Sequence, residues 1–467
     1  MNKKIKDLWY IFSANFLNFL MGIVTGFLVP KFLGIDDYAY VKVFTFYITY
    51  VGISHLGLID GIYIKYGSFE YDELPREKIR GYAKVLLVMQ IIEAIVLSVA
   101  MSILVGNQNR IIIFIFTFFN MIIINMTTLW TYINQITKRF KIFSINTVLS
   151  KVLYLIGLVI LILINSFGYI TYIILQTIIN IIILGIYLYN DRELIFGKSV
   201  SFKEALLDSI SLIKVGFFVL IGNFMSLLIL GIDRLFIDRL FSLKDFAIYS
   251  FAYTLISLFY ILLNSITTVI YPYLTRARKD SYKEVYETIR ISITILMSVT
   301  LCAYFVIKVI VVKFLPQYSE SFSILMYLVP TVIYSGQINI LISNFYKVLN
   351  RTKEYTVNNI VALILAFVTN FGAYVLFKDM KSIAAATLIS FILWILYSDL
   401  YFKKILNVKV VRAYILEGFV LVVFILCAEF LGWFIGAIIY LIAIIIFIAI
   451  FNRRDINNII KMVTKKE

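Results

Sequence analysis

The chain has 467 residues, of which 62% are hydrophobic, and it carries a formal net charge of +16 at pH 7. Its mean hydropathy of +0.94 lies far above that of soluble domains, in which about 45–50% of residues are apolar. The composition therefore excludes a soluble protein and indicates an integral membrane protein.

Apolar residues recur in blocks of roughly 20, the length that an α-helix needs to cross a hydrocarbon core about 30 Å thick. Barrel-like alternation does not occur in the sequence, so the spans are predicted to be helices. The first block follows the charged segment Met1 to Asp7 and lacks a small-residue cleavage site, which favours a first transmembrane helix over a signal peptide.

Fourteen spans are predicted, at about 8–30, 38–62, 82–105, 111–135, 142–165, 168–190, 212–232, 246–273, 287–312, 322–346, 355–377, 382–402, 412–432 and 433–451. The last two are almost contiguous, so totals of 12 or 13 stay open. With a cytoplasmic N-terminus, the inner loops and helix ends carry 32 lysines and arginines and the outer ones carry 10. This roughly threefold excess follows the positive-inside rule and predicts that both termini are cytoplasmic.

The two halves of the chain resemble each other weakly. A shift of 208 positions lays Asn15 on Asn223, Lys31 on Arg239 and Asp37 on Asp245, although only five of the 27 aligned pairs are identical. The shift predicts an N-terminal six-helix lobe at 1–195, a second six-helix lobe at 196–402, and two extra helices with a basic tail at 403–467. Parallel repeats of this kind commonly place a substrate site between them.

The segment that joins the two lobes has a capping-box pattern, Ser201-x-x-Glu204, followed by apolar residues at helical spacing. It predicts an amphipathic helix on the inner membrane surface that leads into the second lobe.

Motifs for ATP hydrolysis, dinucleotide binding or zinc proteolysis are absent from the sequence, and every predicted outer loop is short, which argues against an enzyme. The single histidine, His55, and the widely separated Cys302 and Cys427 argue against a His- or Cys-rich metal site. The basic residues are spread over the loops, so the net charge is explained by membrane topology rather than by nucleic-acid binding.

Ionisable side chains inside spans are the remaining functional signal, because a charge at the bilayer centre costs about 2.5–3.5 kcal/mol even on the lenient insertion scale. Glu93 and Lys151 are placed centrally in the third and fifth spans. Shallower candidates are Lys42, Asp60, Asp233 and Arg234, with the amides Asn15 and Asn223 among the polar residues of the spans.

Structural explanations compete with these functional ones. Arg234 and Asp238 are spaced to pair on one helical turn, Glu93 and Lys151 could form one buried interhelical pair, and single amides often link neighbouring helices.

Several short motifs carry a family resemblance. They are Lys31-Phe-Leu-Gly-Ile-Asp-Asp-Tyr-Ala-Tyr40, Leu56-Gly-Leu58, Ile232-Asp-Arg-Leu235, Ala247-Ile-Tyr-Ser250 with Pro272, and Asn344-x-Tyr346 through Asn350-Arg-Thr-Lys353. In this order and spacing, over residues 1 to 405, the chain resembles bacterial polysaccharide flippases of the multidrug/oligosaccharidyl-lipid/polysaccharide exporter superfamily.

The resemblance implies an all-α protein of the bacterial cell membrane, with two six-helix lobes around a central cavity and two further C-terminal helices. It implies a non-enzymatic transporter that flips a polyprenyl-pyrophosphate-linked oligosaccharide from the inner to the outer leaflet by alternating access, for capsule, exopolysaccharide or O-antigen-type polymers. A polymerase and glycosyltransferases of the same pathway are the expected partners.

A pyrophosphate in a low-dielectric core needs cationic compensation. The expected substrate-binding residues are Lys31, Lys42, Lys151, Arg234, Arg239, Asn15 and Asn223. The expected coupling residues for a proton or sodium gradient are Glu93, Asp60 and Asp233, with no other cofactor.

Departures from relatives limit the substrate. Flippases of lipid-linked peptidoglycan precursors carry arginines in the first helix, and Leu8 to Val29 has none. A multidrug or cation exporter of the same superfamily stays open, although such cavities are expected to be dominated by carboxylates. A membrane-embedded polysaccharide polymerase is a third alternative.

Overall fold

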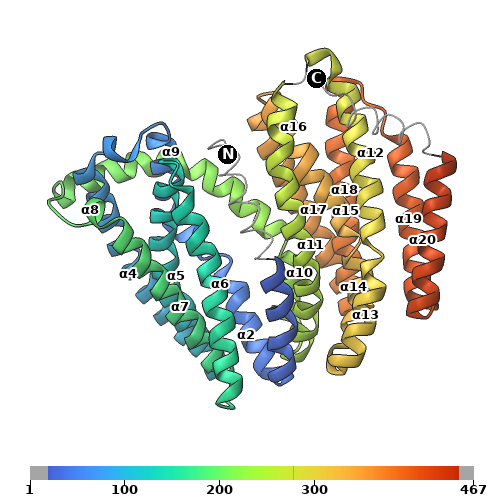
Figure 1. Cartoon of the computed structure of the whole chain (residues 1–467), viewed down its shortest axis with the longest axis horizontal. Helices are drawn as coiled ribbons and strands as arrows, with labels where there is room; N and C mark the ends of the chain where they lie inside the picture. The colour runs from blue at the N-terminus through green and yellow to red at the C-terminus, as the bar shows by residue number, and fades with distance from the viewer. Residues whose placement is uncertain (1–18, 277, 452–467) are drawn as a thin grey trace. The chain divides into compact units, whose positions relative to one another are not determined.

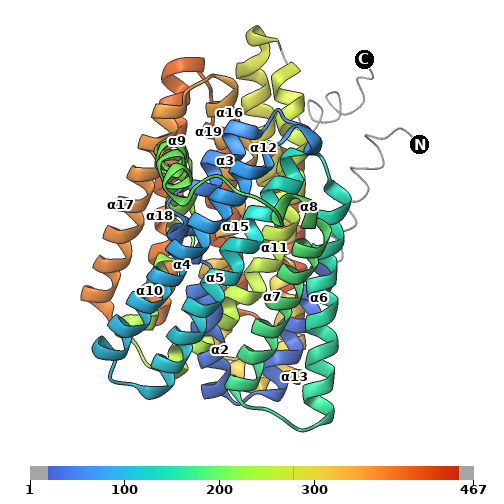
Figure 2. The same cartoon turned by 90° about the vertical axis from the view of Figure 1, so that its left-hand side faces the viewer.

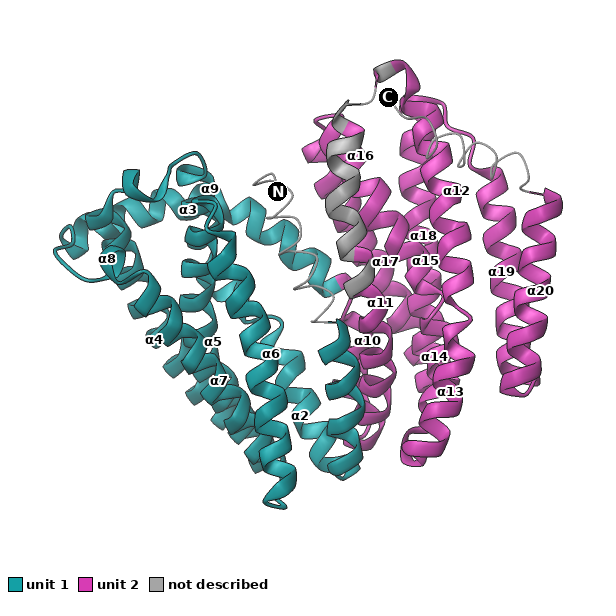
Figure 3. Cartoon of the chain, in the orientation of Figure 1, with its two compact units in different colours: residues 1–228 teal, residues 229–467 magenta. Residues whose placement is uncertain are grey.

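The computed structural model describes residues 19–276 and 278–451, and within these ranges every regular element is helical. The chain forms two compact units, Met1–Leu228 and Ile229–Glu467 (Figure 3). This division by contacts places the joining helix with unit 1, whereas the sequence assigns it to the second lobe. The boundary between the two repeats near residue 195 is inferred from the sequence shift alone, so it stays a prediction.

In unit 1, a helix at Phe19–Phe32 precedes ten further elements (Figure 1). These are α2 (Ile35–Ile48), the 3₁₀ turn η1 (Val51–His55), α3 (Leu58–Tyr66), η2 (Tyr71–Glu73), α4 (Arg76–Leu104), α5 (Gln108–Ile136), α6 (Phe140–Leu163), α7 (Tyr169–Asn190), α8 (Arg192–Ile195) and α9 (Phe202–Ile229). Helix α5 packs between α4 and α7, as Figure 2 shows, and it also contacts α2, α3 and α6.

Unit 2 continues the chain with fourteen elements. These are α10 (Ile232–Leu240), α11 (Leu243–Arg276), η3 (Lys279–Ser281), α12 (Tyr282–Thr300), α13 (Ala303–Phe314), η4 (Pro316–Tyr318), α14 (Ser321–Leu328), α15 (Thr331–Gly336), the π-helical turn η5 (Gln337–Ile342), α16 (Ser343–Val348), α17 (Thr352–Phe377), α18 (Met380–Leu406), α19 (Val411–Phe430) and α20 (Trp433–Phe451). The final pair, α19 and α20, packs together and also contacts α12 (Figure 1).

Among the described residues, eleven helices are long and apolar enough to cross a membrane, or twelve if the bent pair Ile35–His55 and Leu58–Tyr66 is one span. The predicted total of fourteen is therefore not confirmed, although a helix lies at each predicted position. The two C-terminal helices are separate, because the chain leaves helical geometry at Leu431 and Gly432.

Among the described residues, one predicted span is sharply bent, and two others contain local irregularities without such a bend. The span predicted at 38–62 bends by 60° after η1, where Leu56 and Gly57 adopt φ values of 51° and 90°. The span at 287–312 lies within Tyr282–Phe314, whose backbone stays in the helical region at Leu301 and Cys302 between α12 and α13. The span at 322–346 consists of α14, α15, η5 and α16. Hydropathy reports that a segment is apolar but not how its backbone runs, so it cannot detect such a bend or irregularity.

Helix α9 crosses α3 at three glycines. A Cβ on Gly216 would lie 2.0 Å from the carbonyl oxygen of Gly57, and one on Gly61 would lie 2.2 Å from that of Leu212. In lipid, helices associate through close van der Waals packing rather than through exclusion of water, and small residues make that approach possible. The predicted linker helix therefore forms, but it is the first part of one continuous helix fixed on unit 1. Its start is capped as predicted, since the Ser201 hydroxyl accepts a hydrogen bond from the Glu204 N–H at 3.2 Å.

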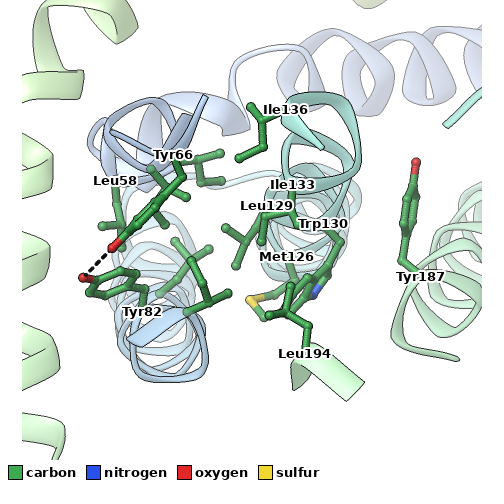
Figure 4. Close-up of a cluster of buried hydrophobic side chains, with 14 of the residues drawn as sticks. Leu58, Tyr66, Tyr82, Met126, Leu129, Trp130, Ile133, Ile136, Tyr187 and Leu194 are labelled. Carbon is green, nitrogen blue, oxygen red and sulfur yellow. Dashed lines mark hydrogen bonds between the residues drawn. The ribbon is translucent and has the colours of Figure 1, made fainter. Parts of the chain in front are cut away.

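The core of unit 1 packs α3 and α4 against α5. Leu58, Leu129 and Trp130 are almost fully buried there, and the hydroxyl groups of Tyr66 and Tyr82 lie 3.3 Å apart within the same cluster (Figure 4). This core holds the break between η1 and α3 beside the polar groups of α4 and α5.

Candidate functional site

Asp233, at the start of α10, is the best-enclosed of the predicted coupling residues. Its side chain is only 2% exposed. The Tyr249 hydroxyl of α11 donates a hydrogen bond to Oδ2 at 2.8 Å, and the Arg234 N–H donates to Oδ1 at 2.7 Å. An anionic carboxylate without such donors would be strongly disfavoured in this apolar setting.

Two further helices complete the group around Asp233. Thr387 of α18 interacts with Asp233, and its hydroxyl donates to the Asn370 Oδ1 of α17 at 3.3 Å. The Arg234 guanidinium lies over the Tyr253 ring, 3.6 Å from its centroid. Elements α10, α11, α17 and α18 thus meet at one carboxylate surrounded by hydroxyl and amide oxygens.

Arg239, at the end of α10, lies outside this group. It is exposed, and its Nε is 3.8 Å from Oδ2 of its neighbour Asp238. The charged stretch therefore begins with the buried Asp233 group and ends with the exposed cation Arg239.

Glu93 of α4 belongs to a polar group beside the break in the second span. It is half-buried and accepts a hydrogen bond from Gln90 Nε2 at 3.1 Å. Gln90 Nε2 also donates to the Ser54 carbonyl at 2.9 Å, and Asn125 Nδ2 of α5 donates to the Val51 carbonyl at 3.1 Å. The amides thus bind backbone carbonyl groups of η1, directly before the bend.

Lys151 does not pair with Glu93 within the part of the chain that the structure describes. It is exposed on α6, while the Glu93 carboxylate is engaged by Gln90. The interpretation of the two residues as one buried ion pair is therefore wrong, because they occupy different faces and environments.

Asp60 of α3 lies near the single histidine. Asp60 is 5% exposed and His55 is 6% exposed, with Nε2 of the histidine 3.8 Å from Oδ2 of the aspartate. The Gly57 N–H donates to His55 Nδ1 at 3.1 Å, so the proton of a neutral imidazole resides on Nε2 and faces Asp60.

The remaining predicted residues lie on separate elements. Lys31 is exposed near the end of the helix Phe19–Phe32, and Asn223 is exposed on α9. Lys42 of α2 is half-buried, with Nζ 5.1 Å from the centroid of the Tyr38 ring. Asn15 falls outside the described residues.

Sequence reasoning missed a buried ionic cluster in unit 2. Arg290 of α12 is fully buried, and Asp399 of α18 and Glu417 of α19 are each 2% exposed. Arg290 pairs with Glu417, and its Nη2 lies 3.3 Å from Asp399 Oδ2. Because Arg290 is close to a loop in the sequence, the positive-inside count includes it among the inner basic residues, whereas the structure buries it among the helices.

Neutral donors complete this cluster. Tyr286 and Tyr414 donate to the two oxygens of Asp399 at 2.5 and 2.6 Å, and Gln337, on the π-helical turn, donates to Glu417 at 2.7 Å. The cluster joins α12, α18, α19 and η5. A signal existed in the sequence, since Asp399 and Glu417 both fall inside predicted apolar spans.

Unit 1 has a further buried carboxylate where α7 meets α8. Asp191, between α7 and α8, is fully buried. Burial raises the pKa of Asp191, and hydrogen bonds from Asn134 and the charge of Arg139 oppose that increase. The Arg139 guanidinium also lies over the Tyr71 ring, 4.2 Å from its centroid. These contacts tie the ends of α5, α6 and α7 together.

Within the described residues, no three His, Cys, Asp or Glu side chains gather closely enough to hold a metal ion.

The chain matches one protein-family profile. The profile of the family described as "Polysaccharide biosynthesis protein" matches residues 5–278. No curated protein sequence matches the chain.

Solved structures share the fold. The lipid II flippase MurJ, in an inward closed conformation, superposes with a TM-score of 0.71 at 14% identity and covers 97% of this chain and 100% of its own. An inward-facing multidrug resistance transporter of the MATE family, MOP superfamily, gives 0.58 at 13% identity, covering 84% and 96%. The MATE transporter VcmN of Vibrio cholerae, in a single-residue variant, gives 0.51 at 11% identity, covering 86% and 96%. At such identities the likeness establishes the fold alone.

Proposed function

Since the chain belongs to the polysaccharide biosynthesis protein family, we propose that it is a flippase for a polyprenyl-pyrophosphate-linked oligosaccharide. The protein would move the repeat unit from the inner to the outer leaflet of the bacterial cell membrane by alternating access. The polymer would be a capsular, exopolysaccharide or O-antigen-type chain, built with a polymerase and glycosyltransferases of the same pathway.

Family membership together with the fold carries this proposal. The chain matches the lipid II flippase MurJ over 97% of its own length and all of the MurJ chain, with both C-terminal helices present. MATE transporters match less of the chain, 84% and 86% in the two cases above. MurJ is a lipid II flippase with the same fold. This likeness favours a lipid-linked substrate for a chain of the polysaccharide biosynthesis family.

The coupling ion is proposed to act at Asp233. A proton or sodium ion is compatible with a buried carboxylate that has Tyr249 and Thr387 hydroxyl groups and the Asn370 amide nearby. In unit 1, Glu93 and Asp60 are proposed to bind the coupling ion. Both are carboxylates in or beside apolar helices with few counter-charges. A proton would bond to one carboxylate oxygen, whereas a sodium ion would need further oxygen ligands beside it.

The pyrophosphate is proposed to contact the cations Lys31, Lys42, Lys151, Arg234 and Arg239, with Asn15 and Asn223 as sugar or phosphate donors. Lys151 is the strongest of these. It is a cation halfway along an apolar helix and is exposed rather than packed in the core. Such a residue normally faces water, a cavity or a ligand.

Depletion of the protein in its host tests the function. We expect complete lipid-linked repeat units to accumulate in the inner leaflet, which lipid extraction with leaflet-selective labelling would detect. Unpolymerised units on the outer face would instead indicate a polymerase. Normal lipid-linked pools combined with drug sensitivity would indicate a multidrug exporter, the alternative that the MATE fold keeps open.

A further inference from the structure

Unit 2 contains a cavity of about 1110 Å³ among α12, α18 and α19. The cavity is larger than the roughly 300–1,000 Å³ of most small-molecule sites. Arg290, Asp399 and Tyr414 line one part of it, so the cavity extends from the buried ionic cluster to the segment that joins α18 and α19.

The cavity has a fixed inner wall. Arg290 and Asp399 are held by the ion pairs and tyrosine hydrogen bonds of the buried cluster. At the other end, Glu287 of α12 accepts a hydrogen bond from the backbone N–H of Lys409 at 2.6 Å, which fastens the joining segment to α12. The walls therefore do not depend on a bound molecule to keep their shape.

The outer part of the cavity is basic. Lys403, Lys409 and Arg412 line it and are exposed. Two carboxylates also line this part, Glu284 and Glu287, and Glu287 is already engaged by the joining segment. The cations outnumber the acids by one, three against two, so the mouth favours an anion.

The side walls are apolar. Ile291 of α12, Leu396 and Leu400 of α18, and Val411 and Ala413 of α19 line the same cavity. A basic mouth at helix ends combined with apolar walls along helices matches an amphiphile rather than a soluble anion. Basic pockets between transmembrane helices on the cytoplasmic side are the type of site that holds phospholipid headgroups.

We infer that this cavity binds one phospholipid of the surrounding membrane, with its phosphate at Lys403, Lys409 and Arg412 and its acyl chains along α18 and α19. The site is distinct from the groups assigned to transport. The inference does not depend on which substrate the chain carries. The lipid fills a space between the last helix of the second repeat and the C-terminal pair, so it stabilises the attachment of that pair.

Native mass spectrometry of the full chain tests the site, with phosphatidylglycerol titrated into the detergent solution. We expect one tightly held lipid per chain. A rim variant, K403Q/K409Q/R412Q, is expected to bind it at least roughly tenfold more weakly, the ratio that corresponds to about 1.4 kcal/mol of lost charge-assisted hydrogen bonding. The matched control, K347Q/R351Q/K353Q, removes the same charge from another polar connection of unit 2 and is expected to stay within about twofold of the parent.

A second variant separates the cavity from simple surface charge. Ala413→Phe adds bulk at a wall residue that is 3% exposed and leaves the charge unchanged. It is expected to lower the occupancy of the tightly held lipid as the rim variant does, with the folded fraction checked by size-exclusion chromatography.

Three results would overturn the inference. They are the absence of a one-to-one lipid complex, equal weakening in the rim and control variants, and displacement of the lipid by inorganic phosphate at equal concentration, which would indicate a site for a soluble anion. Equally tight binding of phosphatidylethanolamine would support it, because the phosphate is the group recognised.

Discussion

At the scale of single residues, the main finding is that one buried cation of unit 2 is shared by two buried carboxylates. One guanidinium, Arg290, meets two carboxylates, Asp399 and Glu417, in a fully buried position. A buried ion pair of this kind contributes little net stability against an apolar replacement, but removing one partner leaves uncompensated charge. The cluster therefore constrains which helices can pack together more than it adds to stability.

Arg290→Met is expected to destabilise the protein by about 3–5 kcal/mol, because it leaves two carboxylates facing each other without a cation. Asp399→Asn is expected to cost less, since a one-to-one pair remains. Thermal unfolding in detergent would measure both. Arg351→Met, which breaks an exposed pair with Glu354, is the control and should change stability by less than about 1 kcal/mol. Equal effects of the two arginine substitutions would refute the role of burial.

Combined substitution of Lys151 and Arg239 by alanine is expected to reduce translocation of a lipid-linked oligosaccharide while membrane insertion stays intact. The reason is that these exposed cations at apolar helices would compensate the pyrophosphate. A reconstituted translocation assay with matched protein amounts measures the effect. Transport at the parent rate in the double variant would remove both residues from the mechanism.

Glu93→Gln and Asp233→Asn are each expected to abolish stimulation of transport by an imposed proton or sodium gradient, because the amide cannot release or exchange a charge. Asp245→Asn is a matched control. Asp245 caps the start of α11 through Ser242, a role that asparagine also fills. If the Glu93 and Asp233 variants respond to the gradient as the parent does, neither carboxylate couples transport to an ion.

At the scale of elements, one pair of helix boundaries coincides under the shift of 208 positions. The helix that ends at Phe32 is followed by α2 at Ile35, and α10 ends at Leu240 before α11 begins at Leu243. Both boundaries differ by the 208 positions of the sequence shift. Tyr38 and Phe246, which the shift aligns, are both buried. The repeat itself stays a prediction, because the break before α10 has no counterpart in the helix Phe19–Phe32.

Glycine packing between α3 and α9 makes a prediction at this scale. Gly216→Ala is expected to destabilise unit 1 by about 1–3 kcal/mol, because the new Cβ would meet backbone atoms of Gly57 and Gly61 at 2.0 and 2.4 Å. Gly222→Ala, on the same helix with nothing within 4 Å, should be neutral or stabilising by up to about 1 kcal/mol. Comparison of the two unfolding curves decides the matter, and a Gly216 variant as stable as the Gly222 variant would contradict the close crossing.

Sequence predicted where the helices lie but not how they connect or bend. Hydropathy located α4 to α7 and α17 to α20 within a few residues, since each is one long apolar block. The break at Gly57 depends on a positive φ and on contact with α9, neither of which hydropathy records. The Arg290 cluster was missed because its partners are 109 and 127 residues away along the chain.

The candidate site was predicted only in part. Asp233, Glu93 and Asp60 were selected because carboxylates are rare in apolar helices, and all three are indeed buried or half-buried. Their hydroxyl and amide neighbours, such as Tyr249 and Thr387, could not be selected, because such residues are common in this sequence. Only packing distinguishes them.

At the scale of the whole molecule, the family and the many apolar helices are those of a multi-pass membrane protein. The positive-inside count predicts that the connection before α17 is cytoplasmic and that the one before α18 is external. In a background without Cys302 and Cys427, a membrane-impermeant thiol reagent applied to intact cells should label Lys381→Cys and not Lys353→Cys. The opposite labelling would invert the topology.

The central claim is translocation of a lipid-linked oligosaccharide, and transport by the purified chain alone tests it most directly. The measurement is the rate at which a labelled polyprenyl-pyrophosphate oligosaccharide becomes accessible on the opposite leaflet of reconstituted vesicles, read by an impermeant enzyme or quencher. We expect a rate above that of protein-free vesicles, and a lower rate in the Lys151 and Arg239 double variant. A rate equal to that of protein-free vesicles, with folded protein present and a gradient imposed, would contradict it.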